Sequence, residues 1–405
     1  MSTASTPAAV GRRIDDSAGL GRAVGELLAA RAESPVLFAL GEPTHGIAAF
    51  PLLRNELLAE LVDCGCRSIM LETDFFAASL VDDYVCGAPA DIDTVLATGF
   101  SHGFGAVPGN RELVEWLRAH NADLAPRDRV RFHGFDAPVE FAAAPSPRQA
   151  LCAIRGYLPT AMRPAMAGTV EALAGDDADW TNEAAMFDPA VSVGGSERAR
   201  TLRIIADDLA GALRRAAPAL RSADPDGYYR AAAHARTAQG LLRYHAAMAD
   251  PAPERIATLL SLRSEMMADN LLAIVDREYR RGPGLVFAHN EHLRRTRAGQ
   301  PADEGEANWC GAGELVEFVL AQRYLFIATD AAPAPGPGTL QSVLAQASTR
   351  RTLFPSPALR AALSPVLETA TPIVPGHIPL TSADVDSADA IIFIADTDGK
   401  RFQYW

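Results

Sequence analysis

The chain lacks the features that mark secreted, membrane-spanning or disulfide-stabilised proteins. It has five cysteines in 405 residues, an odd and sparse set that argues against a disulfide framework. No apolar run approaches the length that spans a bilayer, and residues 1–13 lack the apolar core of a secretory signal. We therefore expect a cytoplasmic protein that does not bind membranes.

A basic surface of the kind that binds nucleic acid is also not indicated. The formal net charge is -13, and no group of Lys and Arg interleaved with aromatic residues reverses the average field. A nucleic acid is therefore not expected as a partner, because its phosphates would be repelled. The sequence favours a small-molecule substrate; it leaves the oligomeric state open.

Several catalytic motifs are absent as well. The sequence has no Gly-x-Ser-x-Gly and no Ser-x-x-Lys, and no Walker or dinucleotide glycine pattern follows an apolar run. These absences argue against a serine hydrolase, a P-loop enzyme and a nicotinamide enzyme. If the protein transfers an acyl group to water, the nucleophile must be water itself, activated by a histidine.

What is present is an alternation of short apolar runs and helical patterns. Residues 36–40 form an apolar run, a helical spacing of apolar residues follows, and residues 68–71 form a second run. A run, a helix and a run predict a βαβ unit with parallel strands. Four further runs predict strands at 130–135, 285–288, 324–328 and 391–395. We therefore predict an α/β fold with a central, mostly parallel sheet flanked by helices.

Between about residues 142 and 281 the pattern becomes helical throughout. Long segments rich in Ala, Leu and Arg predict helices at 197–221, 225–248 and 253–280. We expect three parts: residues 1–141 and 282–405 form the α/β core, and residues 142–281 form a large helical insertion.

Polar residues follow the predicted strands. Ligands of open parallel sheets bind at the carboxyl ends of the strands, so these residues are the first candidates for a site. They are Glu42 and His45, Glu72 and Asp74, Asp136, the segment from His289 to His292, Asp330 and Asp396. A single Asp at such a position is often a helix cap or a loop ion pair, but their coincidence at one edge predicts an acid/base site.

His45 is the strongest candidate for a general base. It lies in a Pro-Thr-His-Gly turn before a predicted helix, with Glu42 three residues earlier. Glu72, at the end of the next strand, is placed to orient the imidazole or to polarise a water molecule. The alternative is a structural turn histidine bonded to a carbonyl group.

His289 and His292 have a spacing that also suits metal ligands. The sequence has no His-Glu-x-x-His motif and its acidic candidates are scattered, so we predict hydrogen-bonding or proton-transfer histidines, with no metal and no cofactor. Arg263 and Asn270 share a stripe of the predicted helix 253–280. Arg263, and likewise Arg54 on the helix after His45, either pairs with a carboxylate or holds the substrate.

The ordered series of these motifs resembles the erythromycin esterase family. The series is Glu42-Pro43-Thr44-His45-Gly46, Arg54, Leu71-Glu72, Trp116-Leu117-Arg118 with Asn121, Gly134-Phe135-Asp136, Arg263 with Met267-Ala268-Asp269-Asn270, and Ala288-His289-Asn290-Glu291-His292. Each motif alone is weak, whereas the order and spacing, from about residue 36 to 330, are fairly specific.

The resemblance implies a function and a set of roles. Members of the family hydrolyse macrolide lactones, which makes an antibiotic-resistance role the expectation by analogy. His45 would be the base, supported by Glu72. His289 and His292, with Arg54 and Arg263, would position the ester and stabilise the oxyanion. The resemblance also implies that the helical insertion covers an active-site cleft.

Five further residues complete the predicted site. Glu42 is placed with the catalytic groups beside His45, and Asp136, Asn270, Asn290 and Glu291 with the substrate-binding groups. Glu291 stands where the family commonly has a small residue, so it would add a carboxylate to the site. The substrate is therefore not fixed by the resemblance.

Three functional hypotheses follow. The leading one is a carboxylic ester hydrolase that uses a histidine-activated water on a cyclic or complex ester, without a covalent serine intermediate. The second is a natural-product biosynthetic enzyme that uses the same residues for ring formation, elimination or acyl transfer. The third is a non-catalytic protein whose histidines bind a metal or haem.

Overall fold

The computed structural model of the chain describes residues 6–139, 143–302 and 305–399. Within these residues the chain forms two compact units. The first draws on Met1–Phe135, Leu271–Ala298 and Cys310–Trp405, and the second on Asp136–Asn270 and Gly299–Trp309. None of the described helices combines the length and apolar content needed to cross a membrane.

An eight-stranded sheet forms the centre of the first unit, in the order β1-β9-β10-β8-β2-β5-β3-β4. Its strands are β1 (Arg12–Arg13), β2 (Leu37–Glu42), β3 (Ser68–Asp74), β4 (Arg131–Asp136), β5 (Gly284–His289), β8 (Tyr324–Ala331), β9 (Arg351–Pro355) and β10 (Ala390–Ile394). From β10 through β8, β2 and β5 to β3, neighbouring strands are parallel. The predicted mostly parallel sheet is confirmed, with a strand at each of the six predicted runs.

Two strands at one edge of the sheet were not predicted. Strand β9 pairs antiparallel with β10, and β1 pairs antiparallel with β9. Strand β1 has two residues, and β9 begins at an arginine and ends at Pro355. Strand β1 is too short to show any pattern, and in β9 only Leu353 and Phe354 are large apolar residues, so it forms no apolar run.

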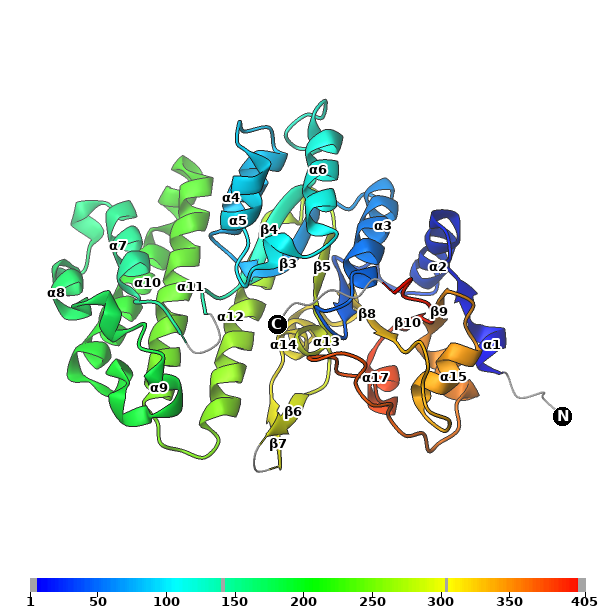
Figure 1. The fold of residues 1–405 in the computed structure, drawn as a ribbon. Helices are drawn as coiled ribbons and strands as arrows, with labels where there is room; N and C mark the ends of the chain where they lie inside the picture. The colour runs from blue at the N-terminus through cyan, green and yellow to red at the C-terminus, as the bar shows by residue number, and fades with distance from the viewer. Residues whose placement is uncertain (1–5, 140–142, 303–304, 400–405) are drawn as a thin grey trace. The chain divides into compact units, whose positions relative to one another are not determined.

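Helices flank the sheet, and Figure 1 shows α2, α3, α4 and α6 on one side of it. The helices of the first unit are α1 (Pro7–Val10), α2 (Ser17–Ala29), α3 (Ala49–Asp63), α4 (Ala78–Val85), α5 (Ile92–Thr98), α6 (Asn110–Asn121), α13 (Asn290–Leu293), α14 (Ala312–Leu320), α15 (Leu340–Gln346), α16 (Ser356–Ala362) and α17 (Ser382–Ser387). A 3-10 turn, η1 (Phe104–Ala106), precedes α6.

Helix α3 shows how the apolar spacing builds the core. Its predicted inner face, Phe50, Leu53, Leu57, Leu58 and Leu61, is at most 1% exposed. This face packs into one cluster with alternate residues of the parallel strands. Each such buried side chain contributes about 1.5–3 kcal/mol of transfer free energy, which holds α3 and the turn before it against the sheet.

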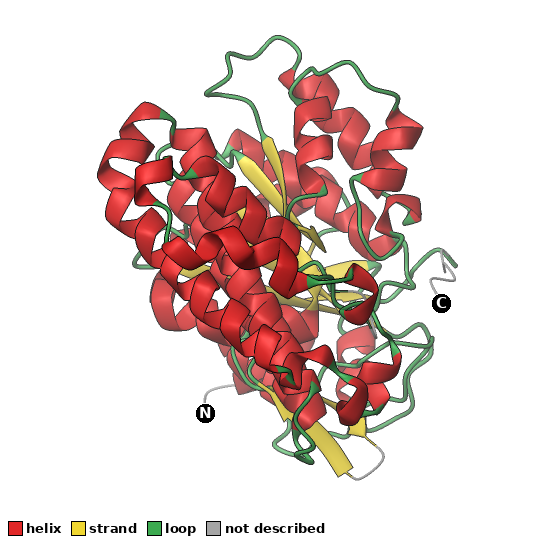
Figure 2. Ribbon diagram, turned by 90° about the vertical axis from the view of Figure 1, so that its left-hand side faces the viewer, coloured by secondary structure: helices red, strands yellow, loops and turns green. Residues whose placement is uncertain are grey.

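The second unit is helical, and the helices dominate the view of Figure 2. Its helices are α7 (Arg148–Tyr157), α8 (Val170–Ala174), α9 (Ala184–Phe187), α10 (Glu197–Ala223), α11 (Pro225–Met248) and α12 (Arg255–Glu278), whose last turns extend into the range of the first unit. A hairpin of β6 (Ala298–Ala302) and β7 (Gly305–Trp309) adds the second sheet. The long helices follow the helical patterns predicted for this segment.

Candidate functional site

Three neighbouring strands bring the predicted groups together in the first unit. Strand β5 lies between β2 and β3, and the last residues of β2 and β5, Glu42 and His289, are register partners. Gly41 permits this arrangement, because a Cβ atom there would lie 2.1 Å from Oδ1 of Asn290. The parallel pairing therefore places Glu42, Glu72 and His289 at one edge of the sheet.

His45 lies between two carboxylates. Its Nδ1 is 2.7 Å from Oε1 of Glu42, and its Nε2 is 4.0 Å from Oε1 of Glu72. An ionised Glu42 can only accept a hydrogen bond, so Nδ1 carries the proton and Nε2 keeps a lone pair. The His45 side chain is 14% exposed, so a small part of the imidazole remains accessible. This geometry is what a general base requires.

Glu72 is held by backbone and side chain together. Its Oε2 accepts a hydrogen bond from the backbone N–H of His289 at 3.0 Å, and its Oε1 lies 3.1 Å from Nε2 of His292. Glu72 is 5% exposed, so these contacts replace most of its hydration. His292 therefore enters the site as a partner of Glu72.

His289 uses both of its ring nitrogens on the protein backbone. Nε2 donates to the carbonyl of Pro43 at 2.9 Å, and Nδ1 accepts from the backbone N–H of Glu291 at 3.2 Å. Burial, followed by the charges of His45 and His292, lowers the pKa of His289 to about 3. His289 is thus neutral at physiological pH and ties the turn after β2 to the turn after β5.

Burial also changes the pKa values of Glu42 and Arg54. Desolvation raises the pKa of Glu42, against the opposing hydrogen bond from His45. Desolvation lowers the pKa of Arg54 to about 9, and the charges of Glu42 and Glu112 oppose this shift. Arg54 therefore remains a cation at neutral pH, and its guanidinium lies 5.0 Å from the centre of the Phe287 ring.

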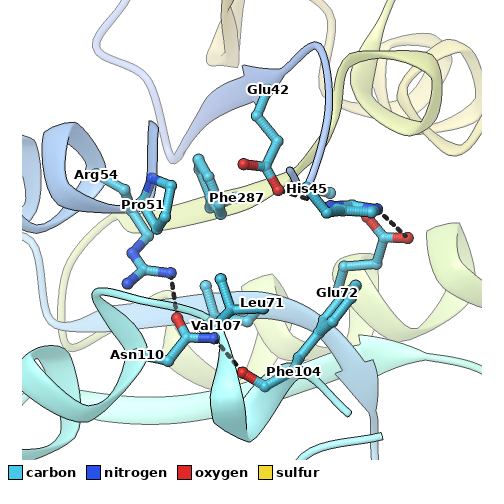
Figure 3. A pocket seen from close by; sticks show the side chains of 11 residues that line it. Glu42, His45, Pro51, Arg54, Leu71, Glu72, Phe104, Val107, Asn110 and Phe287 are labelled. Carbon is cyan, nitrogen blue, oxygen red and sulfur yellow. Dashed lines mark hydrogen bonds and ion pairs between the residues drawn. The ribbon is translucent and has the colours of Figure 1, made fainter. Parts of the chain in front are cut away.

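These groups line a small cavity, shown in Figure 3. Its walls are formed by Glu42, His45, Pro51, Arg54, Leu71, Glu72, Phe104, Val107, Asn110, Phe287 and Ala288. The cavity has a volume of about 20 Å³, which is room for one water molecule. An imidazole lone pair, two carboxylates and a guanidinium therefore surround a space of the size of the nucleophile.

Two predicted substrate-binding residues have protein partners. The amide of Asn290 donates to the carbonyl of Thr329 at 2.9 Å, next to β2. Glu291 pairs with Arg294 at 2.7 Å, and Arg294 pairs with Asp384 at 2.6 Å. Both Asn290 and Glu291 are at most 3% exposed. Neither residue lines the cavity. Both are instead bonded within the protein, which the sequence motif alone did not reveal.

Three more of the predicted substrate-binding residues, Asp136, Arg263 and Asn270, lie in the second unit. Nη2 of Arg263 donates to Oδ2 of Asp136 at 2.5 Å, and its Nε donates to Oδ1 at 3.1 Å, so the two form a bidentate ion pair. Asn270 accepts a hydrogen bond from Arg236. The pairing of Arg263 with a carboxylate is one of the two alternatives that its helical position allowed.

Phe104, Val107 and Asn110 line the cavity without having been predicted. Phe104 and Val107 lie between α5 and α6 and Asn110 begins α6, and such apolar and amide side chains carry no catalytic signature. The signal available was the pair Gly103 and Gly109, which both adopt left-handed backbone conformations. Among the described residues, no group of three or more His, Cys, Asp or Glu is arranged to hold a metal ion.

The sequence and the fold are both similar to known proteins. A sequence model described as erythromycin esterase matches residues 61–397. No protein with a curated description matches the sequence.

Three solved structures share the fold at low sequence identity. One is a protein from Bacillus cereus, with a TM-score of 0.71, 15% identity and coverage of 96% of this chain and 95% of the other. A succinoglycan biosynthesis protein has a TM-score of 0.67, 15% identity and coverage of 96% and 95%. A mutant of the erythromycin esterase EreC, in its open conformation, has a TM-score of 0.65, 17% identity and coverage of 92% and 93%.

Proposed function

Because the chain belongs to the erythromycin esterase family, we propose that it hydrolyses a carboxylic ester with a water molecule that His45 activates. The observation that carries this proposal is the placement of His45 between Glu42 and Glu72 at a cavity with room for one water molecule. The family match begins at residue 61, so the support for Glu42 and His45 is the geometry itself.

In the proposed reaction, His45 acts first as a base and then as an acid. Nε2 takes a proton from water while the water oxygen attacks the carbonyl carbon of the ester. The tetrahedral intermediate then breaks its bond to the alcohol oxygen, and Nε2 returns the proton to that oxygen. The products are an acid and an alcohol, and no serine forms a covalent intermediate.

The two carboxylates have different parts in this scheme. Glu42 holds the Nδ1–H tautomer and stabilises the imidazolium that forms when Nε2 takes the proton. Glu72, fixed by His289 and His292, faces Nε2 and orients the water. His289 thus acts as a positioning residue, because its own nitrogens are already bonded.

The substrate class follows from the family by analogy. We infer a macrolide lactone or a similar cyclic or complex ester, a small molecule that enters from the open side of the cavity. The positive charge of Arg54 stabilises the developing oxyanion at the cavity wall. Arg263, Asp136 and Asn270 remain predicted substrate-binding groups of the helical unit.

The variant His45→Ala tests the mechanism. We expect it to lose ester turnover while keeping the fold, and we expect His245→Asn, a buried histidine of the second unit, to retain turnover in the folded protein. Product mass separates hydrolysis, which adds one water, from ring formation, elimination or acyl transfer. Full turnover in His45→Ala would overturn the proposed base.

A further inference from the structure

The segment that leads from helix α5 to the start of helix α6 carries an aromatic ring to the proposed base. It starts at Ser101, whose Oγ accepts from the N–H of Asp74 at 2.8 Å and whose N–H donates to Oγ1 of Thr73 at 2.7 Å. It ends at Asn110, the first residue of α6. Both ends are therefore fixed to elements that bear site residues, Thr73 and Asp74 following Glu72 directly.

Phe104 is the point at which this segment meets His45. The centres of the two rings are 4.8 Å apart, and the rings are inclined by 56°. Phe104 is 8% exposed and also forms a wall of the one-water cavity. The phenyl ring therefore limits both the rotation of the imidazole and the volume beside it.

Asn110 holds the backbone of Phe104 in place. Its Nδ2 donates to the carbonyl of Phe104 at 2.8 Å, and its Oδ1 accepts from Nη1 of Arg54 at 2.7 Å. Figure 3 shows the resulting series from Arg54 through Asn110 to Phe104. Asn110 is 4% exposed, so neither bond competes with bulk water.

The helix start adds to the same arrangement. Nη2 of Arg54 donates to the carbonyl of Gly109 at 3.0 Å, and Gly109 has a φ of +91° that favours glycine. The guanidinium of Arg54 thus donates hydrogen bonds to the last two residues of the segment, Gly109 and Asn110. Its position in the cavity and the position of Phe104 are coupled through one amide side chain.

We infer that Asn110 is a positioning residue for the proposed hydrolysis, acting through Phe104 on the orientation of the His45 imidazole. The expected loss of kcat rests on the proposed function, whereas the expected change in the orientation of the His45 imidazole does not. Asn110 does not touch the reacting atoms. Its loss removes one of two hydrogen bonds to the Phe104 carbonyl and leaves the one from the N–H of Val107 at 3.0 Å, so the ring shifts away from His45 and Nε2 is held less firmly toward the cavity.

Asn110→Asp is the sharpest test, because the carboxylate keeps an acceptor for Arg54 and loses the donor to Phe104. We expect kcat to fall roughly 10- to 100-fold with little change in KM, since small misplacements of a catalytic group cost this much. Phe104→Ala should cause a similar fall. The double variant should be no slower than the slower single variant, because both changes act through the contact between the Phe104 ring and the His45 imidazole.

Asn121→Asp is the matched control. Asn121 ends the same helix, is 1% exposed, and its Nδ2 donates to the carbonyls of Val85 and Val130. The same chemical change there should reduce stability without changing kcat of the folded protein. If Asn110→Asp does not fold, Phe104→Leu, which keeps apolar bulk but removes the ring, takes its place.

A second readout does not need turnover. The imidazole resonances of His45, assigned in an NMR spectrum by comparison with His45→Ala, should change chemical shift in Asn110→Asp but not in Asn121→Asp. Additive kinetic losses, or equal kcat values in the two Asn→Asp variants, would overturn the inference. If the parent protein hydrolyses no ester, the proposed function fails, and unmoved His45 resonances would then separately reject the role of Asn110.

Discussion

Nδ1 of His45 lies 2.7 Å from Oε1 of Glu42, which is only three residues earlier in the chain. Strand β2 ends at Glu42, and the turn that follows, in which the N–H of Gly46 donates to Oγ1 of Thr44, brings the imidazole to the carboxylate. The pair is therefore local in sequence. Its environment is not local, because Glu72, Phe104 and His289, which lie next to His45, come from distant segments of the chain.

Glu42→Gln should separate activity from stability. Because an amide can hold the wrong imidazole tautomer, we expect kcat to fall at least about 10-fold. Burial raises the pKa of Glu42, so removal of its charge should cost less than about 1 kcal/mol of unfolding free energy at neutral pH. Steady-state kinetics and chemical denaturation check both expectations. Unchanged kcat would contradict the role of Glu42.

Gly41→Ala should destabilise the protein. The new Cβ would lie 2.1 Å from Oδ1 and 3.1 Å from Cα of Asn290, whose amide is bonded to Thr329 and cannot move aside. We expect a loss of about 1–3 kcal/mol in the free energy of unfolding, measured by denaturant titration. Gly25→Ala, on the exposed side of α2 with nothing within 4 Å, should instead gain up to about 1 kcal/mol.

Glu291→Gln tests whether this carboxylate serves the fold. Glu291 is 3% exposed and pairs with Arg294, so the change weakens a buried ion pair and should lower the free energy of unfolding by about 1–3 kcal/mol. Glu317→Gln is the control, since Glu317 pairs with Arg295 at 3.3 Å with 38% of its side chain exposed. A raised KM with an unchanged free energy of unfolding would instead show that Glu291 binds the substrate.

Acid should destabilise the protein through two buried histidines, one in each unit. Burial lowers the pKa of His289 to about 3 and that of His245 to about 4. Below the ordinary histidine pKa of about 6.5 the unfolded chain binds protons that the folded chain does not, so stability is present above that pH and is lost as the pH falls. Each histidine contributes a slope approaching about 1.4 kcal/mol per pH unit.

The comparison of wild-type protein with His245→Asn isolates one of these slopes. Denaturant titrations between about pH 7 and about pH 5 should show a shallower loss of stability in the variant. The raised pKa of Glu42 acts in the opposite direction in both proteins and therefore cancels in the difference. Parallel pH profiles would show that His245 is not neutral in the folded state.

The parallel strands and the inner face of α3 follow from local patterns. A short apolar run bounded by polar or turn residues suits a strand that is buried on both faces of a parallel sheet, and leucines three and four apart mark one helix face. Strand β9, next to the edge strand β1, escaped prediction because it is short and is bounded by Arg351 and Pro355. Its pairing is set by β10, far along the chain, rather than by its own residues.

The candidate site likewise contains residues that could be predicted from the sequence and residues that could not. Glu42, His45, Glu72 and His289 could be grouped in advance, because carboxyl ends of parallel strands share one edge. The directions of Asn290 and Glu291 could not be predicted, since adjacent residues of a short helix point to different surroundings. Phe104 and Asn110 gave no signal because ordinary side chains become part of a site only through what they contact.

The sequence by itself determined the fold class, the resemblance to its family and the strand ends at which chemistry was to be sought. Only the tertiary structure decided which side chains meet there: His45 with two carboxylates, His289 bonded on both nitrogens, and Arg54 joined to Phe104 through Asn110. The physical reason is that periodicity encodes which face of an element is buried. Hydrogen-bond partners depend on atoms brought together from segments distant in the chain.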